Sequence, residues 1–208
     1  MPLIVVCGFP SSGKTSRAIE LYNYFKDKKS KKVVLISENH LVQNSHYDKN
    51  EYFSNAHFEK LIRSSLKSQV IASLNTEDLV ILDAGNYIKG YRYELYCASK
   101  LVTTTQCTLL CSCNKDAALN FNQNRDKSFE DYLGENNSLI PYSEQVFTEL
   151  CQRFEEPNEN CRWDKPLFIT YPNEDLNLNE IDDVLYQGKK LAPNLSTQNV
   201  SQITIFFL

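Results

Sequence analysis

A glycine-rich stretch near the start of the chain carries a lysine and a threonine at the spacing that binds phosphate. Residues 8–15 have the sequence GFPSSGKT, which fits the pattern G-x-x-x-x-G-K-[ST] at every fixed position. The glycines let backbone N–H groups turn inward around a phosphate, and the N-terminus of a following helix adds partial positive charge. We expect Lys14 to reach the β- and γ-phosphates and the Thr15 hydroxyl to bind Mg²⁺. The pattern therefore predicts a nucleoside triphosphate site formed by Gly8, Pro10, Ser11, Ser12, Gly13, Lys14, Thr15 and Ser16.

The segments on both sides of this loop have the patterns that a phosphate loop requires. Residues 3–7 are an apolar run with β-branched side chains, which predicts a buried strand. After the loop, Ala18, Leu21 and Phe25 recur on one face of a predicted helix. A chance match in an unrelated strand–helix unit is the alternative, and the order of strand, loop and helix argues against it.

Two acidic residues follow apolar runs that are predicted to be strands. Residues 79–82 are apolar and lead to Asp83, which is the pattern of the second Mg²⁺ element in these folds, although many strands end in Asp. Glu38 comes soon after the apolar residues 33–36. Its place suits a group that orients a water or accepts a proton from a substrate hydroxyl, and equally a helix cap or a surface group. We therefore expect Asp83 to support the metal ion and Glu38 to face the catalytic edge of the sheet.

One arginine is a candidate for the lid of a phosphoryl-transfer enzyme. In such enzymes arginines close over the γ-phosphate and neutralise the charge that develops there. Arg125 comes three residues after Asn122 and just before the polar residues 126–140, where a lid is expected. An exposed arginine at a helix end is the alternative. Residues 114–116 depart from the guanine-recognising pattern N-K-x-D, because the acid comes one residue early, so the expected nucleotide is ATP.

Segments with strand-like and helix-like patterns alternate along the chain. The predicted strands are residues 3–7, 33–36, 79–83, 105–111 and 166–170. Helices are predicted after the phosphate loop and near residues 58–70, 93–101, 116–125, 141–154 and 178–189, whereas residues 39–55 are predicted to be a long loop. The expected buried face of the second helix consists of Phe58, Leu61, Ile62, Leu66 and Val70.

This alternation predicts an α/β fold. We expect a P-loop NTPase of the kinase-like type, with a doubly wound parallel five-stranded sheet and helices on both faces. Residues 1–190 are expected to form this ATPase domain. Residues 191–208 are expected to be a linker-like tail, the truncated start of a C-terminal region.

The composition excludes several other classes of protein. Hydrophobic residues make up 42% and charged residues 23% of the 208 residues, which predicts a soluble globular domain. No apolar stretch approaches the ~20 residues of a membrane helix, so no membrane is expected as a partner. The seven cysteines are scattered and lie mostly in apolar runs, which indicates a reducing compartment, the cytoplasm and also the nucleus. No zinc site is expected, because Cys111-x-Cys113 lacks a second pair.

Three blocks of the sequence resemble one known family. They are residues 1–15 (MPLIVVCGFPSSGKT), residues 83–97 (DAGNYIKGYRYELYC), and residues 153–157 (RFEEP) followed by 162–168 (RWDKPLF). These blocks resemble the Elongator-associated P-loop ATPases, the killer-toxin-insensitivity-twelve proteins. That family is in turn similar to the kinase that phosphorylates seryl-tRNA on the way to selenocysteine.

The resemblance implies an ATPase that is stimulated by tRNA and associates with Elongator, which begins the modification of the wobble uridine in certain tRNAs. It implies that Lys14 and Thr15 bind phosphate and Mg²⁺, that Asp83 supports the metal, and that Arg125 belongs to the lid. It also implies that Arg92 and Arg162 border the nucleotide site; for the neighbouring Trp163, a role as a core residue is an equal alternative. Family members continue past residues 196–199 into a helical domain that helps to hold tRNA. The apolar residues 203–208 do not resemble this continuation, so we expect the tRNA-binding half to be missing.

Three functions are compatible with these residues. The first is an ATP-hydrolysing accessory factor of tRNA modification, which the three blocks favour. The second is a kinase that transfers the γ-phosphoryl group to a hydroxyl of RNA or of a small molecule, since the expected fold and lid permit it. The third is a non-catalytic assembly module that binds ATP only to set its shape.

Overall fold

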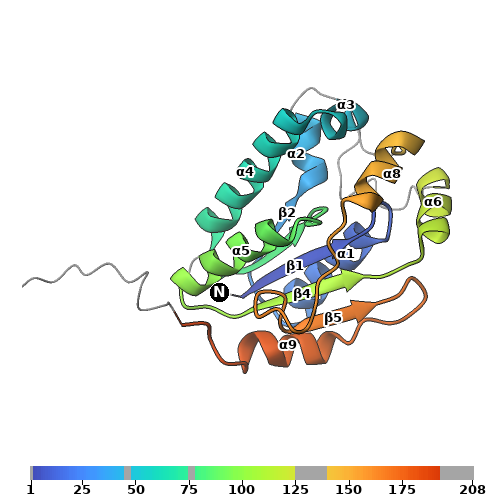
Figure 1. The fold of residues 1–208 in the computed structure, drawn as a ribbon. Coiled ribbons are helices and arrows are strands. Elements are labelled where there is room, and N and C mark those ends of the chain that lie inside the picture. Colours follow the sequence, from blue (N-terminus) through green and yellow to red (C-terminus); the bar gives the residue numbers. More distant parts are fainter. Residues whose placement is uncertain (1, 45–47, 75–77, 125–139, 193–208) are drawn as a thin grey trace, which may run out of the picture.

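The computed structural model describes residues 2–44, 48–74, 78–124 and 140–192. Five strands form one parallel sheet in the order β2-β3-β1-β4-β5 (Figure 1). The strand bounds are β1 Leu3–Gly8, β2 Val33–Ser37, β3 Leu79–Asp83, β4 Gln106–Cys111 and β5 Leu167–Thr170. In the sheet, β2 and β3 lie on one side of β1, and β4 and β5 lie on its other side. The strand order therefore reverses at β1, which is where doubly wound sheets bind their ligands.

Helices connect consecutive strands and complete the predicted doubly wound arrangement. A short π-helical turn, η1, continues the first helix directly. The bounds in the described residues are α1 Lys14–Asn23, η1 Tyr24–Lys28, α2 Glu38–Asn44, α3 Lys49–Ser54, α4 Ala56–Ser73, α5 Lys89–Leu101, α6 Lys115–Gln123, α8 Glu144–Gln152 and α9 Leu178–Tyr186.

Both faces of the sheet are buried, so its strands are apolar on both sides. In β1, Leu3 and Val5 point into one core, which α2, α3, α4, α5 and α8 cover. Ile4 and Val6 point into the other core, against α1, η1 and α9. Figure 1 shows α4 and α9 on opposite sides of the sheet. Because helices cover both faces of the sheet, the strands have the uninterrupted hydrophobic runs from which they were predicted.

The strand register brings the chemically important ends together. Val6 of β1 lies opposite Asp83 of β3, and Ser37 of β2 lies opposite Asp83 on its other side. Gly8, where β1 ends and the phosphate loop begins, lies opposite Cys111 of β4. The phosphate loop and the acidic end of β3 therefore share the carboxyl edge of the sheet.

The prediction of a long loop over residues 39–55 was wrong. Two short helices, α2 and α3, occupy most of this stretch, and both contribute to the core. The helix α3 begins after Asp48, whose side chain accepts a hydrogen bond from the N–H of Asn50, and it buries Tyr52 and Phe53. Helices this short gain their stability from tertiary contacts and leave little periodicity in the sequence.

Other helix predictions need smaller corrections. Pro141 does not open α8, which begins at Glu144 with Ser143 as its N-cap. Leu61 is not on the buried face of α4, since it is 54% exposed. The last helix ends at Tyr186, three residues before the predicted end. The helix α6 ends at Gln123, so the predicted helix end at Arg125 lies outside the described residues.

The first glycine of the phosphate loop has no room for a side chain. Gly8 has a φ of +150°, and a Cβ at this position would lie 2.4 Å from the carbonyl oxygen of Cys111. Gly8→Ala is therefore expected to lower the free energy of unfolding by about 2–4 kcal/mol, from backbone strain and overpacking. Chemical denaturation measures this loss. Gly90→Ala is the control, because a Cβ there meets nothing within 4 Å. Equal stabilities of the two variants would contradict the steric argument.

Candidate nucleotide-binding site

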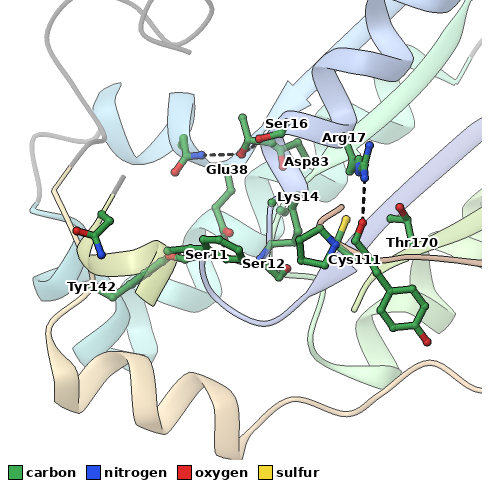
Figure 2. A pocket seen from close by; sticks show the side chains of 18 of the residues that line it. Ser11, Ser12, Lys14, Ser16, Arg17, Glu38, Asp83, Cys111, Tyr142 and Thr170 are labelled. Carbon is green, nitrogen blue, oxygen red and sulfur yellow. Dashed lines mark hydrogen bonds between the residues drawn. The ribbon is translucent and has the colours of Figure 1, made fainter. Parts of the chain in front are cut away.

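The phosphate loop borders a cavity of about 500 Å³. Six of the predicted nucleotide ligands line this cavity: Ser11, Ser12, Gly13, Lys14, Thr15 and Ser16. Figure 2 shows the side chains of the loop facing Glu38, Asp83 and Tyr142. The predicted ligands Gly8 and Pro10 do not line it, but border a smaller hollow of about 10 Å³ beside the loop.

The loop has the backbone conformation that turns N–H groups inward. Ser11 and Gly13 have φ values of 58° and 86°, in the left-handed region, and Gly13 is the N-cap of α1. The ammonium group of Lys14 donates hydrogen bonds to the carbonyl oxygens of Gly8 and Phe9, at 3.2 and 2.5 Å. Lys14 therefore lies within the curve of the loop, where phosphate-binding lysines act.

Thr15 and Asp83 meet at the edge of the sheet, as predicted for a metal site. The Thr15 hydroxyl donates to Oδ2 of Asp83 at 2.9 Å, and the Ser37 hydroxyl donates to the same oxygen at 3.2 Å. No cluster of three or more His, Cys, Asp or Glu side chains that could hold a metal occurs in the described part of the chain. One hydroxyl and one carboxylate suit Mg²⁺, which takes few protein ligands and completes its shell with phosphate oxygens and water.

Glu38 is buried beside this pair and is not a surface group. Its Oε2 accepts a hydrogen bond from the N–H of Gly85 at 2.9 Å, and its Oε1 accepts one from the Tyr52 hydroxyl at 3.4 Å. Burial raises the pKa of Glu38, the charge of Asp83 raises it further, and Gly85, Lys14 and Lys49 oppose the shift. The pKa of Asp83 is also raised by burial, against the hydrogen bond from Thr15 and the charge of Lys14. A carboxyl group with a raised pKa is suited to proton transfer near neutral pH.

The raised pKa of Glu38 predicts a stability that falls as pH rises. A group that binds its proton more tightly in the folded state contributes most below its unfolded pKa, and this contribution is lost as pH rises through the folded pKa. Glu38→Gln removes the titration and keeps an oxygen acceptor. We expect the free energy of unfolding of this variant, minus that of the wild type, to increase from pH 5 to pH 8. Urea titrations across this range measure the difference, and a constant difference would contradict burial as the dominant cause.

The structure does not place Arg92 or Arg162 at the cavity. Arg92 is 0% exposed, and its guanidinium donates to Oδ1 of Asp164 at 2.8 Å and to the carbonyl oxygen of Asn86 at 2.9 Å. Arg162 is exposed and does not line the cavity. The expectation that these two residues border the nucleotide is therefore corrected: Arg92 is a core residue and Arg162 a surface residue. Arg125, the predicted lid arginine, lies outside the described residues.

Trp163 does not line the cavity either. Its ring packs edge-to-face on Tyr93 at a centroid distance of 5.3 Å, and the ammonium group of Lys89 lies 5.4 Å from its centroid. Its carbonyl oxygen accepts a hydrogen bond from the side chain of Gln106 on β4. Trp163 is half-buried and belongs to neither hydrophobic core, so the expected core role is not what the structure shows; its ring packs near the surface of α5.

Sequence reasoning missed several residues of the cavity wall. Lys49 lines the cavity, and its ammonium group lies 3.8 Å from the ring centroid of Tyr142. Arg17 also lines it and donates to the carbonyl oxygen of Tyr171 at 3.0 Å. The one available signal for Lys49 was its position in a long polar stretch close to a phosphate loop, a kind of segment that is often functional.

Two asparagines, Asn50 of α3 and Asn122 of α6, hold the segment that carries Tyr142. Asn122 donates to the carbonyl oxygen of Tyr142 at 2.8 Å and accepts from its N–H at 2.9 Å. Asn50 donates to the carbonyl oxygen of Pro141 at 3.1 Å and accepts from the N–H of Ser143 at 2.7 Å. Asn122 also accepts a hydrogen bond from Ser11 at 3.1 Å. This asparagine pair therefore connects the segment that carries Tyr142 to α3, α6 and the phosphate loop.

Comparison with known proteins identifies the family of this chain. The sequence matches a family model described as "Chromatin associated protein KTI12" over residues 1–207. The chain belongs to the KTI12 family. A KTI12 homolog of Xenopus laevis is 40% identical over 198 residues, which are 95% of this chain and 66% of that relative. Saccharomyces cerevisiae KTI12 is 31% identical over 203 residues, which are 93% of this chain and 60% of that relative.

The solved structures agree with this assignment. Chaetomium thermophilum Kti12, crystallised in complex with ADP-AlF3, is 35% identical with a TM-score of 0.72, and the match covers 88% of this chain and 99% of that chain. Mycobacterium tuberculosis APS kinase CysC has a TM-score of 0.56 at 14% identity, which shows a shared fold alone. The kinase-like P-loop fold is thus confirmed for this KTI12-family chain. In its described residues, no helix combines the length and apolarity needed to cross a membrane.

Proposed function

We propose that this chain is an Mg²⁺-dependent ATPase that acts as an accessory factor of Elongator in the modification of tRNA wobble uridines. The observation that carries the enzymatic part is the junction of the phosphate loop with β3, where Thr15 bonds to Asp83 beside Lys14. Lys14 would hold the β- and γ-phosphates. Thr15 and Asp83 would hold Mg²⁺, which when bound neutralises charge on the transferred phosphoryl group.

The comparisons support nucleotide binding at this loop. The Chaetomium thermophilum relative was crystallised with ADP-AlF3, and the match to it covers nearly the whole of that chain. Residues 1–190 are proposed to be the ATPase domain and residues 191–208 a tail. In this proposal Arg125 belongs to the lid over the γ-phosphate, as the resemblance implies.

The Elongator and tRNA parts of the proposal come from the family resemblance. They are proposals for a whole protein, and this chain spans about two thirds of the Xenopus laevis relative and 54% of an Arabidopsis thaliana one. The family description as chromatin associated supports a location in the nucleus, in addition to the cytoplasm expected from the cysteines.

A second candidate is a kinase that transfers the γ-phosphoryl group to a hydroxyl. The observation that favours it is Glu38, a buried carboxyl group that lines the cavity next to Asp83. Burial raises the pKa of Glu38. Such a group can accept the proton of an acceptor hydroxyl, or orient a water molecule for hydrolysis.

The deciding experiment follows the γ-phosphate of ATP during turnover by the purified chain, with and without bulk tRNA. Free phosphate that increases when tRNA is added supports the accessory factor. Label on the tRNA supports the kinase instead. Turnover that ignores tRNA would leave an ATPase and remove tRNA sensing from this chain. Absence of turnover, with partner binding lost in Lys14→Ala, would favour the non-catalytic assembly module.

A further inference from the structure

A small hollow adjoins the phosphate end of the nucleotide cavity. Its volume is about 10 Å³, against about 500 Å³ for the cavity. Lys14, Glu38 and Tyr142 line both spaces, so the two meet at these residues. Tyr171 and Pro172, which follow β5 and line the cavity, do not line the hollow. The hollow therefore lies at the end of the cavity where Lys14 is expected to hold the γ-phosphate.

The rest of the wall of the hollow is mostly apolar and is fixed by packing. Phe53 and Leu150, which belong to the hydrophobic core, form part of it. Phe154 also lines the hollow, and its ring packs edge-to-face on Phe9 of the phosphate loop at a centroid distance of 5.1 Å. Because protein cores are close-packed, the hollow cannot widen unless these side chains are repacked.

The hollow has the size and the polar groups that hold one water molecule. A water needs about 10–15 Å³ of such volume and at least two polar partners. The ammonium group of Lys14 has three protons, and the carbonyl oxygens of Gly8 and Phe9 accept two of them. Oε1 of Glu38 accepts from the Tyr52 hydroxyl at 3.4 Å, longer than the typical O–H···O distance of about 2.7–2.8 Å. A water in the hollow can therefore accept from Lys14 and donate to Glu38.

We propose that this hollow holds the water molecule that attacks the γ-phosphate, and that its apolar wall excludes larger hydroxyl compounds. The water oxygen forms a bond to the γ-phosphorus, the bond from that phosphorus to the β–γ bridging oxygen breaks, and ADP leaves with the bonding electrons. A proton of the water passes to Oε1 of Glu38. Even methanol, the smallest alcohol, carries a methyl group for which a space of one water has no room. This inference rests on the nucleotide site and the ATP hydrolysis proposed above, and it makes Leu150 and Phe154 determinants of the phosphoryl acceptor.

The test follows the γ-phosphoryl group of ATP during turnover in dilute methanol with Mg²⁺. Phosphorus NMR separates inorganic phosphate from methyl phosphate. We expect the wild type to form almost only inorganic phosphate. Leu150→Ala removes most of a side chain from the wall of the hollow. It should raise the share of methyl phosphate by at least about 10-fold, the scale on which a pocket distinguishes one added carbon.

Leu185→Ala is the matched control for Leu150→Ala. Both leucines are buried, but Leu185 belongs to the core on the other face of the sheet and does not line the hollow. The two variants lose the same atoms and should lose similar stability, yet only Leu150→Ala should form more methyl phosphate. Phe154→Leu is a milder truncation of the same wall and should shift the products in the same direction, which keeps the test decisive if Leu150→Ala does not fold.

Glu38→Gln tests the proton acceptor separately from the size of the hollow. The glutamine keeps an oxygen that can accept from the N–H of Gly85, but it cannot take a proton from water. Turnover should fall by about 10²–10⁴-fold, the usual contribution of general base catalysis. Binding of the ATP analogue AMPPNP, measured by titration calorimetry, should stay close to that of the wild type.

The products distinguish failure of this inference from failure of the proposed function. Equal shares of methyl phosphate from the wild type and the folded wall variants would overturn the inference and leave the ATPase standing. The same holds for equal shares from Leu150→Ala and Leu185→Ala, or for wild-type turnover in Glu38→Gln. Absence of both products with the wild type would instead overturn the proposed ATPase.

Discussion

Asp83→Asn is expected to keep nucleotide binding and to lose Mg²⁺-dependent turnover. The asparagine oxygen can still accept the hydrogen bond that Thr15 donates at 2.9 Å, so the phosphate loop keeps its shape. The negative charge that would hold the metal is lost. We expect turnover to fall by roughly 10²–10³-fold, the scale of removing one preorganised electrostatic contact from a transition state. Turnover measured against Mg²⁺ concentration, beside nucleotide binding in a chelator, separates the two effects.

Ser37→Ala is the matched control for Asp83→Asn. Ser37 donates to the same carboxylate oxygen at 3.2 Å, and its removal leaves the charge of Asp83 in place. Its turnover should stay within a few-fold of the wild type, since one neutral hydrogen bond contributes only about 1 kcal/mol. Wild-type turnover in Asp83→Asn would remove this residue from the catalytic site.

Arg92→Met is expected to have the largest effect on stability. Arg92 and Asp164 are both 0% exposed and form an ion pair at 2.8 Å. Removing the arginine leaves a buried carboxylate without its cation, which typically costs about 3–5 kcal/mol. Denaturant unfolding measures the loss. The exposed Arg162→Met serves as the control and should change the free energy of unfolding by less than about 0.5 kcal/mol.

A double variant distinguishes the unpaired charge from lost packing. Arg92→Met combined with Asp164→Leu removes both charges, so it should be more stable than Arg92→Met alone. If the double variant is less stable than the single one, hydrogen bonds to neighbours of the pair dominate. One such neighbour is the N–H of Asn158, which donates to Asp164 at 3.1 Å.

The arginine of this ion pair also supports the backbone on which the nucleotide site is built. Arg92 donates to the carbonyl oxygen of Asn86, and the Asn86 side chain donates to the carbonyl oxygen of Val6 at 2.7 Å. Val6 lies two residues before the phosphate loop, and Asn86 lies three residues after Asp83. Arg92 thus acts on the site through the backbone that carries the phosphate loop and Asp83.

The part of the site that local patterns encode was predicted from the sequence. Lys14 and Thr15 belong to one loop with fixed spacing, and Asp83 ends a strand whose hydrophobic run is unmistakable. Parallel strands then bring their carboxyl ends to one edge, so Glu38 was also expected near the site. In contrast, Arg92 was misplaced because its partner Asp164 is 72 residues away, and no local pattern reports such a pairing.

The errors in the fold have the same physical origin. The helices α2 and α3 are seven and six residues long, too short to show a helical period. Their stability depends on burying side chains such as Tyr52 and Phe53 in a core formed by distant segments. The start of α8 was misplaced because Pro141 resembles a first helical residue, whereas its carbonyl oxygen pairs with Asn50 and the helix begins after Ser143.

The asparagine pair has a consequence for which substitutions the chain can accept. Asn50 and Asn122 bond to main-chain groups of residues 141–143, and none of these bonds uses a side chain of that segment. These hydrogen bonds do not depend on which side chain is present, so most replacements of Tyr142 would preserve the path of the backbone. Proline is the exception, because it has no N–H to donate to Asn122. The side chain at position 142 can therefore change while the backbone that carries it keeps its place between α3 and α6.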